Sequence, residues 1–535
     1  MSIRVSNLTY RLPNQDTLLS DIAFSIPDGC KCAIVGNNGT GKSTLLNILS
    51  GQCLCSSGDI ECAGAYLVPQ HYGQYDGMTV AETLHIEDKY RAFKAILSGD
   101  ASERNFEILQ DDWELEARVA AAFRTWGIPY ISLDTQFSQL SGGEKTKVFL
   151  SGIAIHNPDV ILMDEPTNHL DVEGREQLLG FISESNVTIL VASHDRTLLN
   201  GIDSILHLTR QGIKYYPMKY DEFYQLYQQE CDAISRHLDA KQRDLGKAKR
   251  QARECAERQQ KRFSRGAKLS ESKCLARISK GGLKNKSENT ASNIDKVQAE
   301  RIETINREID ELKSLVPEEA CIKINVASSN LHKGKVLVEL NSVNFNYAGS
   351  DPLWRECINL TIRSGDRIRI TGKNGHGKTT LLKLISGELN PTSGTIFRAD
   401  SISCIYLDQE YKFINDEKTV LEQLASETVN MPEHELKIRL HRFLFPAHTW
   451  DKKCSALSGG EKMRLAICSL MVRDSAPDII ILDEPTNNID IANMEILAQT
   501  LRDYQGTLIA ISHDLAFISD IQVQSTLDLS ALSAF

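Results

Sequence analysis

The sequence predicts an α/β protein built from two similar domains in tandem, joined by a long helical hairpin. Three observations support this fold class. The two halves of the chain repeat the same short motifs in the same order, which indicates an internal duplication. Each glycine-rich motif stands between an apolar, strand-like segment and an apolar segment that begins like a helix. The stretch between the halves, 218–316, contains no proline, so continuous helix is permitted there.

These observations divide the chain into three parts. We expect the first domain at 1–217, the hairpin at 218–316 and the second domain at 317–535. Between corresponding motifs, the first domain holds about 22 more residues than the second. They lie near 87–122, where two helical segments flank a turn of small and polar residues. We therefore expect a short helical arm on the first domain.

Length and composition exclude several classes of protein. The 535 residues, of which 41% are hydrophobic, suffice for about three units with substantial cores. No run reaches the roughly 20 apolar residues that cross a bilayer, and the amino terminus lacks the features of a signal peptide. We expect a cytoplasmic protein. The 13 cysteines lack the spacing of zinc ligands, so we expect reduced thiols and no metal-thiolate centre.

The charge is unevenly distributed along the chain. The net charge is −11, but residues 236–286 hold 17 Lys and Arg against 5 Asp and Glu, a local net of +12. The rest of the chain therefore carries −23. A polyanionic partner should meet the basic segment first.

The apolar residues of the hairpin recur at alternating steps of three and four, with one position missed, which is typical of two packed helices. The first helix should run for about 40 residues, with the turn near 279–293. Its seam comprises Tyr227, Cys231, Ile234, Leu238, Leu245, Ala248 and Ala252, and that of the second helix Ile302, Ile305, Ile309, Leu312 and Val316. The basic residues then lie toward the tip.

Each half contains a glycine-rich loop between a strand and a helix, which is the context of a phosphate-binding loop. The loops comprise Gly36, Asn37, Asn38, Gly39, Thr40, Gly41, Lys42, Ser43 and Thr44, and Gly372, Lys373, Asn374, Gly375, His376, Gly377, Lys378, Thr379 and Thr380. Lys42 and Lys378 should reach the β and γ phosphates. Ser43 and Thr379 should bind Mg²⁺.

Two acidic residues end a buried strand in each half, and a histidine follows a later strand. We expect Asp164 and Asp483 to hold Mg²⁺ through water, and Glu165 and Glu484 to orient the attacking water during γ-phosphoryl transfer. His194 and His513 follow predicted strands in both halves and are candidates for a γ-phosphate contact. A lone histidine is more often structural, so the duplicated position carries this assignment.

A third repeated motif, LSGGEK, places a serine and two glycines at a predicted helix start, where exposed N–H groups suit an anion. The residues are Ser141, Gly142 and Gly143, and Ser458, Gly459 and Gly460. With this motif, both halves resemble ATP-binding cassette ATPase domains over about 430 residues. The resemblance implies ATP hydrolysis at two crossed sites, each formed by the phosphate-binding loop of one domain and the LSGGEK motif of the other. Lys42 would then face Ser458, and Lys378 would face Ser141.

The same resemblance assigns further nucleotide contacts. Gln70 and Gln409 match the family's glutamine that touches Mg²⁺ and the attacking water. Tyr347 matches the aromatic residue that stacks on adenine. In the first domain we place the corresponding position at Leu12, with the nearest aromatic at Tyr10. Tyr10 either stacks on adenine from a displaced backbone or is a core strand residue.

The two fused cassette domains, the helical spacer between them and the sequence motif PTNHLD resemble the F group of this superfamily. Members of that group are translation factors that act on ribosomes. The resemblance implies a monomer whose spacer reaches toward transfer RNA at the peptidyl site, and whose release follows hydrolysis. Basic residues near the tip fit RNA phosphates. We expect the contacts at Arg262, Arg265, Lys268, Lys273, Arg277, Lys280, Lys284 and Lys286.

Other functions remain open at this stage. An energising subunit for a separate membrane partner is one alternative, although a basic hairpin has no evident role there. A DNA-repair or chromosome ATPase is another, but the zinc cysteines and very long coiled coils of those groups are absent from the sequence. Within the translation group, a housekeeping factor and an antibiotic-resistance protein are not separated. The ribosomal contact of the arm is also open, since the arm is short.

Overall fold

The computed structural model describes most of the two domains and the stem of the hairpin. The described residues are 3–62, 64–100, 102–209, 211–272, 296–297, 299–312, 332, 334–347, 351–373, 375–400, 402–408, 411–428, 430–473, 475–486, 489–530 and 532; the side chains at 259, 260, 262–272, 491 and 492 lie outside the description. The chain forms two compact units, Met1–Phe223 with Ile322–Phe535, and Tyr224–Cys321. Both predicted domains thus belong to the first unit.

The first domain contains two sheets. An antiparallel sheet has the order β2 (Thr17–Ile26), β1 (Ile3–Arg11), β4 (Ser57–Glu61). The second sheet has the order β5 (Ala65–Val68), β6 (Val160–Asp164), β7 (Thr188–Ala192), β3 (Lys31–Val35), β8 (Ser204–Thr209), β9 (Gly212–Tyr216), and only β9 is antiparallel to its neighbour. Its helices are α1 (Lys42–Leu49), α2 (Val80–Thr83), α6 (Gly142–His156), α7 (Val172–Glu184) and α8 (Arg196–Asn200).

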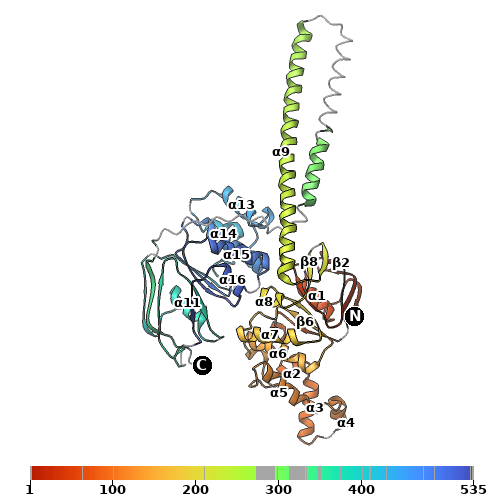
Figure 1. Cartoon of the computed structure of the whole chain (residues 1–535), viewed down its shortest axis with the longest axis vertical. Helices are drawn as coiled ribbons and strands as arrows, with labels where there is room; N and C mark the ends of the chain where they lie inside the picture. The colour runs from red at the N-terminus through yellow and green to blue at the C-terminus, as the bar shows by residue number, and fades with distance from the viewer. Residues whose placement is uncertain are drawn as a thin grey trace. The chain divides into compact units, whose positions relative to one another are not determined.

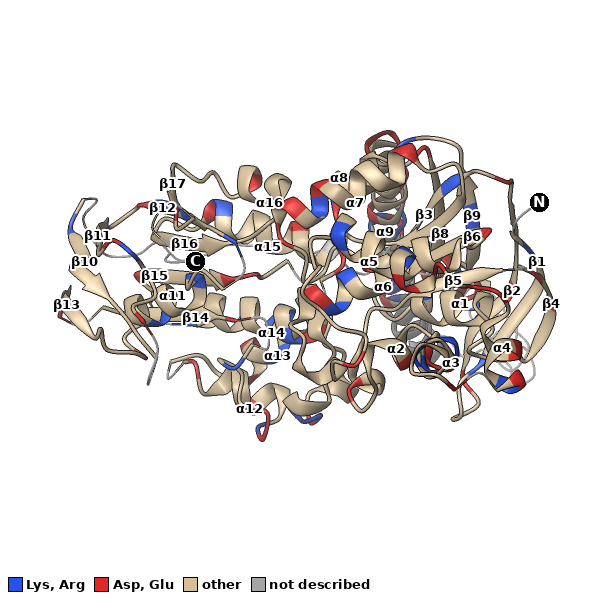
Figure 2. Cartoon of the chain, turned by 90° about the horizontal axis from the view of Figure 1, so that it is seen from below, with Lys and Arg blue, Asp and Glu red and all other residues tan. Residues whose placement is uncertain are grey.

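The second domain repeats this plan. Its antiparallel sheet has the order β11 (Ile358–Arg363), β10 (Val336–Asn344), β13 (Ser393–Arg398). Its parallel sheet has the order β14 (Cys404–Leu407), β15 (Ile479–Asp483), β16 (Thr507–Ile511), β12 (Arg367–Thr371), β17 (Ser525–Asp528), as Figure 2 shows. The helices are α11 (Lys378–Ser386), α12 (Val420–Ala425), α13 (Glu433–Arg442), α14 (Gly459–Val472), α15 (Ile491–Asp503) and α16 (Leu515–Asp520). Short 3₁₀ turns occur in both domains, at Gly73–Tyr75 and Phe137–Gln139 in the first and at Ala447–Thr449 and Cys454–Ala456 in the second.

Burial explains why the central strands are continuously apolar. Every residue of β6, β7, β15 and β16 is buried. Parallel strands need this composition because both faces of their sheet are covered. The carboxyl ends of parallel strands lie at one edge of the sheet, and ligands of open α/β sheets bind there. The phosphate-binding loop, the acidic pair and the histidine all follow such strands, so this edge positions the site.

The hairpin begins with α9 (Tyr220–Ser272), which is longer than the 40 residues expected, and residues 299–312 form a second helix beside it (Figure 1). The predicted seam residues that are described are less exposed than their neighbours, with Ala248 and Ile309 buried. At the missed position of the pattern, Lys241 donates to Glu308 of the second helix, Nζ to Oε2 2.7 Å. An ion pair thus fills the gap in the apolar seam.

The arm contains three helices where we expected two. They are α3 (Glu87–Leu97), α4 (Glu103–Leu109) and α5 (Leu115–Thr125). Between α4 and α5, the ring of Trp113 meets those of Phe93 and Phe106 at centroid distances of 6.5 and 6.0 Å. The helix α4 was missed because its seven residues are too few to show a helical repeat, and packing against α3 holds it.

A buried cation supports helix ends in the second domain. Arg367, on β12, is 8% exposed, and its guanidinium donates to the carbonyl oxygens of Leu501 (3.0 Å), Arg502 and Tyr504 near the end of α15, and of Ile521 after α16. The last carbonyls of a helix have no partner within the helix, so a cation there is stabilising. In the first domain, Lys31 makes one comparable bond, Nζ to the Ser183 carbonyl oxygen at 2.7 Å.

We predict that Arg367→Met destabilises the second domain by about 3 kcal/mol or more, because several buried carbonyl groups lose a charged donor. Hydrogen exchange of the α15 amides, read as the free energy of opening, measures this effect. Lys31→Met is the matched control and should cost about 1 kcal/mol, since it removes a single bond. Equal losses for the two variants would contradict the prediction.

Candidate nucleotide site

Glycine is required where each phosphate-binding loop turns into its helix. Gly41 and Gly377 immediately precede α1 and α11, with φ of +98° and +80°. A Cβ atom at Gly41 would lie 2.8 Å from Leu19 Cδ2, and one at Gly377 would lie 2.3 Å from Leu353 Cδ2. Left-handed backbone and close packing both exclude a larger residue. Both loops therefore require glycine at the residue before the helix.

The two loop lysines fold back onto their own loops. Lys42 Nζ donates to the carbonyl oxygens of Gly36 (2.5 Å) and Asn37 (3.2 Å), and Lys378 Nζ to that of Gly372 (2.7 Å). Burial lowers the pKa of both lysines, and the Glu165 and Glu484 carboxylates oppose this shift. Phosphate oxygens are stronger acceptors for a charged donor than carbonyls are. Both lysines can therefore turn to phosphates without leaving the loop.

The two candidate catalytic glutamates have the same unusual backbone. Glu165 and Glu484 follow β6 and β15 with φ of +48° and +49°, and their N–H groups donate to the carbonyl oxygens of Ala192 (2.8 Å) and Ile511 (2.9 Å). Both are 8% exposed. Burial raises the pKa of Glu165 to about 8 and also raises that of Glu484. Such buried carboxylates, held at a strained turn, suit the role of accepting a hydrogen bond from water.

The histidines lie beside these glutamates. His194 Nε2 is 3.5 Å from Glu165 Oε1, and His513 Nε2 is 3.1 Å from Glu484 Oε1. Burial and the nearby lysines lower the pKa of His194, and that of His513 falls to about 3. Both imidazoles are therefore neutral at pH 7. Among the described residues, Nδ1 of His194 has no hydrogen-bond partner, and Nε2 lies against the Glu165 carboxyl group.

The oxygen atoms expected to bind Mg²⁺ come together in the first domain. Asp164 is buried and forms a hydrogen bond with Ser43, which partly offsets the rise in the pKa of Asp164 caused by burial. A carboxylate and a hydroxyl next to a phosphate loop are the ligands that Mg²⁺ prefers, so these residues fit the ion. Half-buried Gln70 follows β5, as expected, whereas Gln409 lies outside the described residues.

The serine of each LSGGEK motif caps its own helix. Ser141 and Ser458 precede α6 and α14, and both close a reciprocal capping box with Glu144 and Glu461. Ser141 Oγ donates to Glu144 Oε2 at 2.7 Å, and Ser458 Oγ to Glu461 Oε2 at 2.9 Å. These glutamates were not predicted from the sequence, although S-x-x-E is a recognisable signal of a helix start. The glycines that follow lie in the first turn of each helix, where N–H groups have no partner within the helix.

Each phosphate loop also contacts the other domain. Asp490, the N-cap of α15, accepts a hydrogen bond from the backbone N–H of Asn38, Oδ2 to N 3.1 Å. In the opposite direction, Lys373 Nζ lies 2.7 Å from Glu173 Oε1 on α7. Neither acidic residue was assigned a role from the sequence. The contacts pair the Lys42 loop with the second domain and the Lys378 loop with the first, which is the pairing that crossed sites require.

The two adenine positions differ. Tyr347 is half exposed, and its hydroxyl lies 2.9 Å from Thr380 Oγ1 on α11, beside the second phosphate loop. Tyr10 lies within β1, packs against the core, and contacts Cys53 Sγ at 3.7 Å. This placement favours the interpretation of Tyr10 as a core strand residue. Arg11, and not Leu12, stands at the same distance from Gly36 in sequence as Tyr347 stands from Gly372.

The remaining predicted residues fall partly outside the description. Asn374, Lys273, Arg277, Lys280, Lys284 and Lys286 are outside the described residues. Arg262, Arg265 and Lys268 lie on α9, but their side chains are not described. Among the described residues, no group of His, Cys, Asp and Glu could hold a metal ion by itself. Nor does any described helix meet the length and hydropathy needed to cross a membrane.

The fold and the site define a class of protein. It is an ATPase made of two nucleotide-binding domains, each with a phosphate-binding loop, an acidic pair at the end of a strand and a capped helix that begins at the LSGGEK motif. Comparison with known proteins agrees. The family model described as ABC transporter matches residues 19–168 and 356–487. The chain is 30% identical to the ATP-binding protein Uup of Haemophilus influenzae, over 92% of this chain and 73% of that protein. It is also 30% identical to ABC transporter F family member 2 of Arabidopsis thaliana, over 94% and 73% respectively.

One solved structure has a similar fold. The archaeal ribosome recycling factor aABCE1, in complex with a ribosomal stalk protein, matches with a TM-score of 0.57 at 20% identity, over 98% of this chain and 87% of that one. The likeness concerns the fold. The chain belongs to the ABC transporter family, and within it to the F group of tandem ATP-binding cassette ATPases.

Proposed function

We propose that the chain is a cytoplasmic translation factor that binds the ribosome as a monomer in its ATP state, and that hydrolysis permits its release. The hairpin would reach toward transfer RNA at the peptidyl site. Membership of the F group supports this proposal, since the resemblance to that group implies action on ribosomes. Mg²⁺ would accompany ATP at both sites, held by Asp164 with Ser43 and by Asp483 with Thr379.

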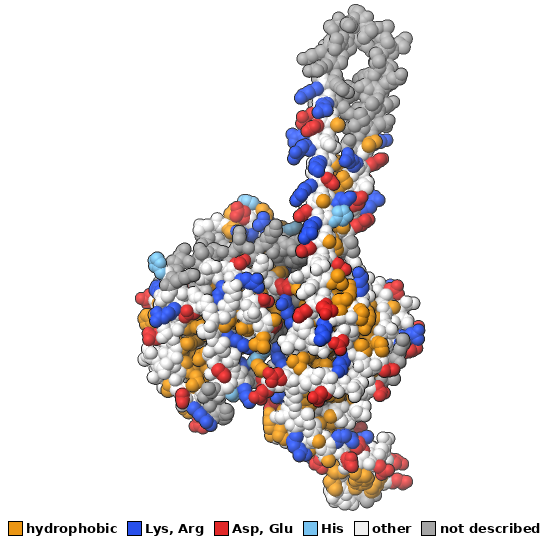
Figure 3. Space-filling view, in the orientation of Figure 1, with side chains coloured by type: hydrophobic (Ala, Val, Ile, Leu, Met, Phe, Trp, Pro, Cys, Tyr) orange, Lys and Arg blue, Asp and Glu red, His pale blue; other side chains and the backbone are white. Residues whose placement is uncertain are grey.

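The observation that carries the ribosome proposal is the charge of residues 236–261, the part of α9 that leads toward the tip of the hairpin. These residues hold nine Lys and Arg against four Asp and Glu. Eight of the nine basic side chains are exposed, with Lys247 at 74%, Arg253 at 83% and Arg258 at 77%, and Figure 3 shows basic groups along the hairpin. Some pair with carboxylates of the same helix, but exposed pairs of this kind are weak. A surplus of cations therefore remains available for RNA phosphates.

We predict that neutralising the tip weakens ribosome binding and flattens its dependence on salt. The variant carries Gln at Arg262, Arg265, Lys280, Lys284 and Lys286 in a hydrolysis-blocked background. Each lost phosphate contact should reduce the slope of log affinity against log salt by about 0.7 to 0.9, so five would reduce it by about 4. Titration of ribosome association at several salt concentrations measures both quantities.

The matched control neutralises five cations outside the hairpin, at Arg4, Arg124, Lys214, Lys453 and Arg502. It changes the net charge equally and should leave the slope nearly intact. Unchanged affinity and slope in the tip variant would show that the hairpin is a solvated spacer. Sedimentation with membranes instead of ribosomes would favour a transporter subunit. Drug susceptibility of cells with and without the chain separates a housekeeping role from ribosome protection against an antibiotic.

A further inference from the structure

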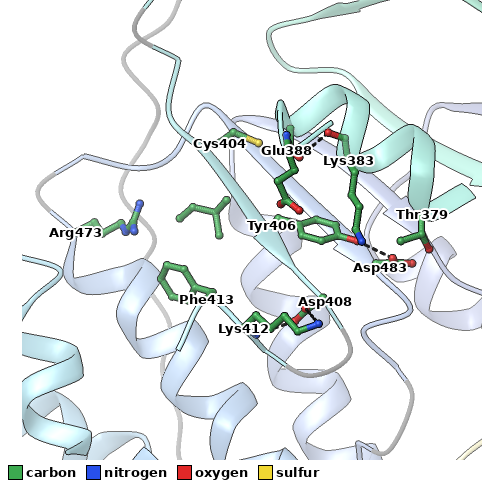
Figure 4. Close-up of a pocket in the computed structure, with 12 residues that line it drawn as sticks. Thr379, Lys383, Glu388, Cys404, Tyr406, Asp408, Lys412, Phe413, Arg473 and Asp483 are labelled. Atoms are coloured by element: carbon green, nitrogen blue, oxygen red, sulfur yellow. Dashed lines mark hydrogen bonds and ion pairs between the residues drawn. The ribbon is translucent and has the colours of Figure 1, made fainter. Parts of the chain in front are cut away.

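Among the described residues, the second domain contains a contact to its candidate Mg²⁺-binding carboxylate that the first domain lacks. Tyr406, on β14, donates its phenolic hydrogen to Asp483 Oδ2, with an oxygen to oxygen distance of 2.7 Å (Figure 4). Asp483 ends the neighbouring strand, β15. Figure 4 shows Thr379, the other Mg²⁺ candidate of this site, close to Asp483.

The register of the sheets identifies the counterpart of Tyr406. Tyr406 pairs with Ile481, two residues before Asp483. In the first domain, Leu67 pairs with Leu162, two residues before Asp164. A leucine side chain cannot donate a hydrogen bond. Asp164 instead forms its side-chain hydrogen bond with Ser43. The two carboxylates therefore meet different partners at equivalent positions.

Tyr406 contacts Asp483 at the wall of a cavity. The cavity measures about 770 Å³, and Thr379, Lys383 and Asp483 line it as well. A carboxylate has two oxygens with about four lone-pair positions, so one bond to the phenol leaves acceptor capacity for the Mg²⁺ shell.

We propose that Tyr406 is a positioning residue that fixes the orientation of Asp483 and thereby makes the second nucleotide site bind Mg²⁺ more tightly than the first. The inference rests on the Mg²⁺–ATP site proposed above. Outer groups that orient a metal ligand typically contribute 10- to 100-fold in metal affinity. The chain would then carry two sites that fill at different Mg²⁺ concentrations, although their sequence motifs are nearly the same.

Mg²⁺ titration of nucleotide binding tests the inference on the full chain. The second site is isolated by Lys42→Ala and the first by Lys378→Ala, both with Glu165→Gln and Glu484→Gln to prevent turnover. Binding of a fluorescent ATP analogue is followed as Mg²⁺ is added. Tyr406→Phe should raise the Mg²⁺ concentration for half-maximal binding at the second site about tenfold. It should leave the first site, and binding without Mg²⁺, unchanged.

Tyr66→Phe is the matched control, because it removes a phenol from the corresponding strand of the first domain that bonds to the Phe149 carbonyl oxygen at 3.0 Å and not to a carboxylate. It should not change the Mg²⁺ requirement of either site. An unchanged or lowered Mg²⁺ requirement in Tyr406→Phe would overturn the inference. Binding that is independent of Mg²⁺ at both sites in the parent would overturn the proposed metal site itself, which distinguishes the two failures.

Discussion

Changing both Glu165 and Glu484 to Gln should abolish steady-state ATP hydrolysis and leave ATP binding intact. Glutamine keeps the shape of the side chain but cannot accept a proton from the attacking water, so it cannot activate that water as a base. Because general-base assistance contributes about 10²- to 10⁴-fold, turnover should fall at least about 100-fold. Phosphate release and equilibrium binding of labelled ATP measure the two properties. In cells, the trapped ATP form should arrest growth by holding ribosomes.

The matched control places Gln at Glu116 and Glu435, which are exposed on α5 and α13. It makes the same change in charge and should hydrolyse ATP at the parent rate. Each single variant, Glu165→Gln or Glu484→Gln, should lose turnover at its own site only. Parent-like hydrolysis by the double variant would show that these two carboxylates do not activate the water.

Replacing Ser458 with Arg should damage the nucleotide site that contains Lys42, although the two residues are more than 400 positions apart in sequence. The hydrogen bond from Asn38 to Asp490 already pairs the first loop with the second domain. A bulky cation at the start of α14 would block the N–H groups of Gly459 and Gly460 that we expect to meet the phosphates. Nucleotide crosslinking at each loop lysine should fall about tenfold or more at Lys42, and little at Lys378.

Two variants separate this effect from local damage. Ser458→Ala removes the helix cap, at a cost of about 1 kcal/mol, without adding bulk, so most crosslinking should remain. Ser141→Arg is the mirror variant and should reverse the pattern, with the loss at Lys378. Loss confined to Lys378 after Ser458→Arg would contradict the crossed arrangement.

The sequence by itself determined the features that depend on local rules. Gly41 and Gly377 must be glycine because the backbone there is left-handed, and this requirement is visible as a spaced motif. The strands before Glu165 and Glu484 are apolar up to their last residue, an aspartate, because both faces of a parallel sheet are buried. The serine and two glycines of LSGGEK similarly mark the start of α6 and α14. Duplication made each of these signals readable twice.

Only the tertiary structure decided which distant residues meet. The bond between Tyr406 and Asp483 depends on the register of β14 against β15, and Asp490 reaches Asn38 only when the two domains pack together. Lys241 interrupts the apolar seam of the hairpin, and its hydrogen bond to Glu308 of the second helix is seen only in the tertiary structure. The residues in these contacts are far apart in the sequence and are not related by a periodic pattern, so no local sequence pattern predicts the contacts. Motifs identify the chemistry of each site, while packing decides how the two sites differ.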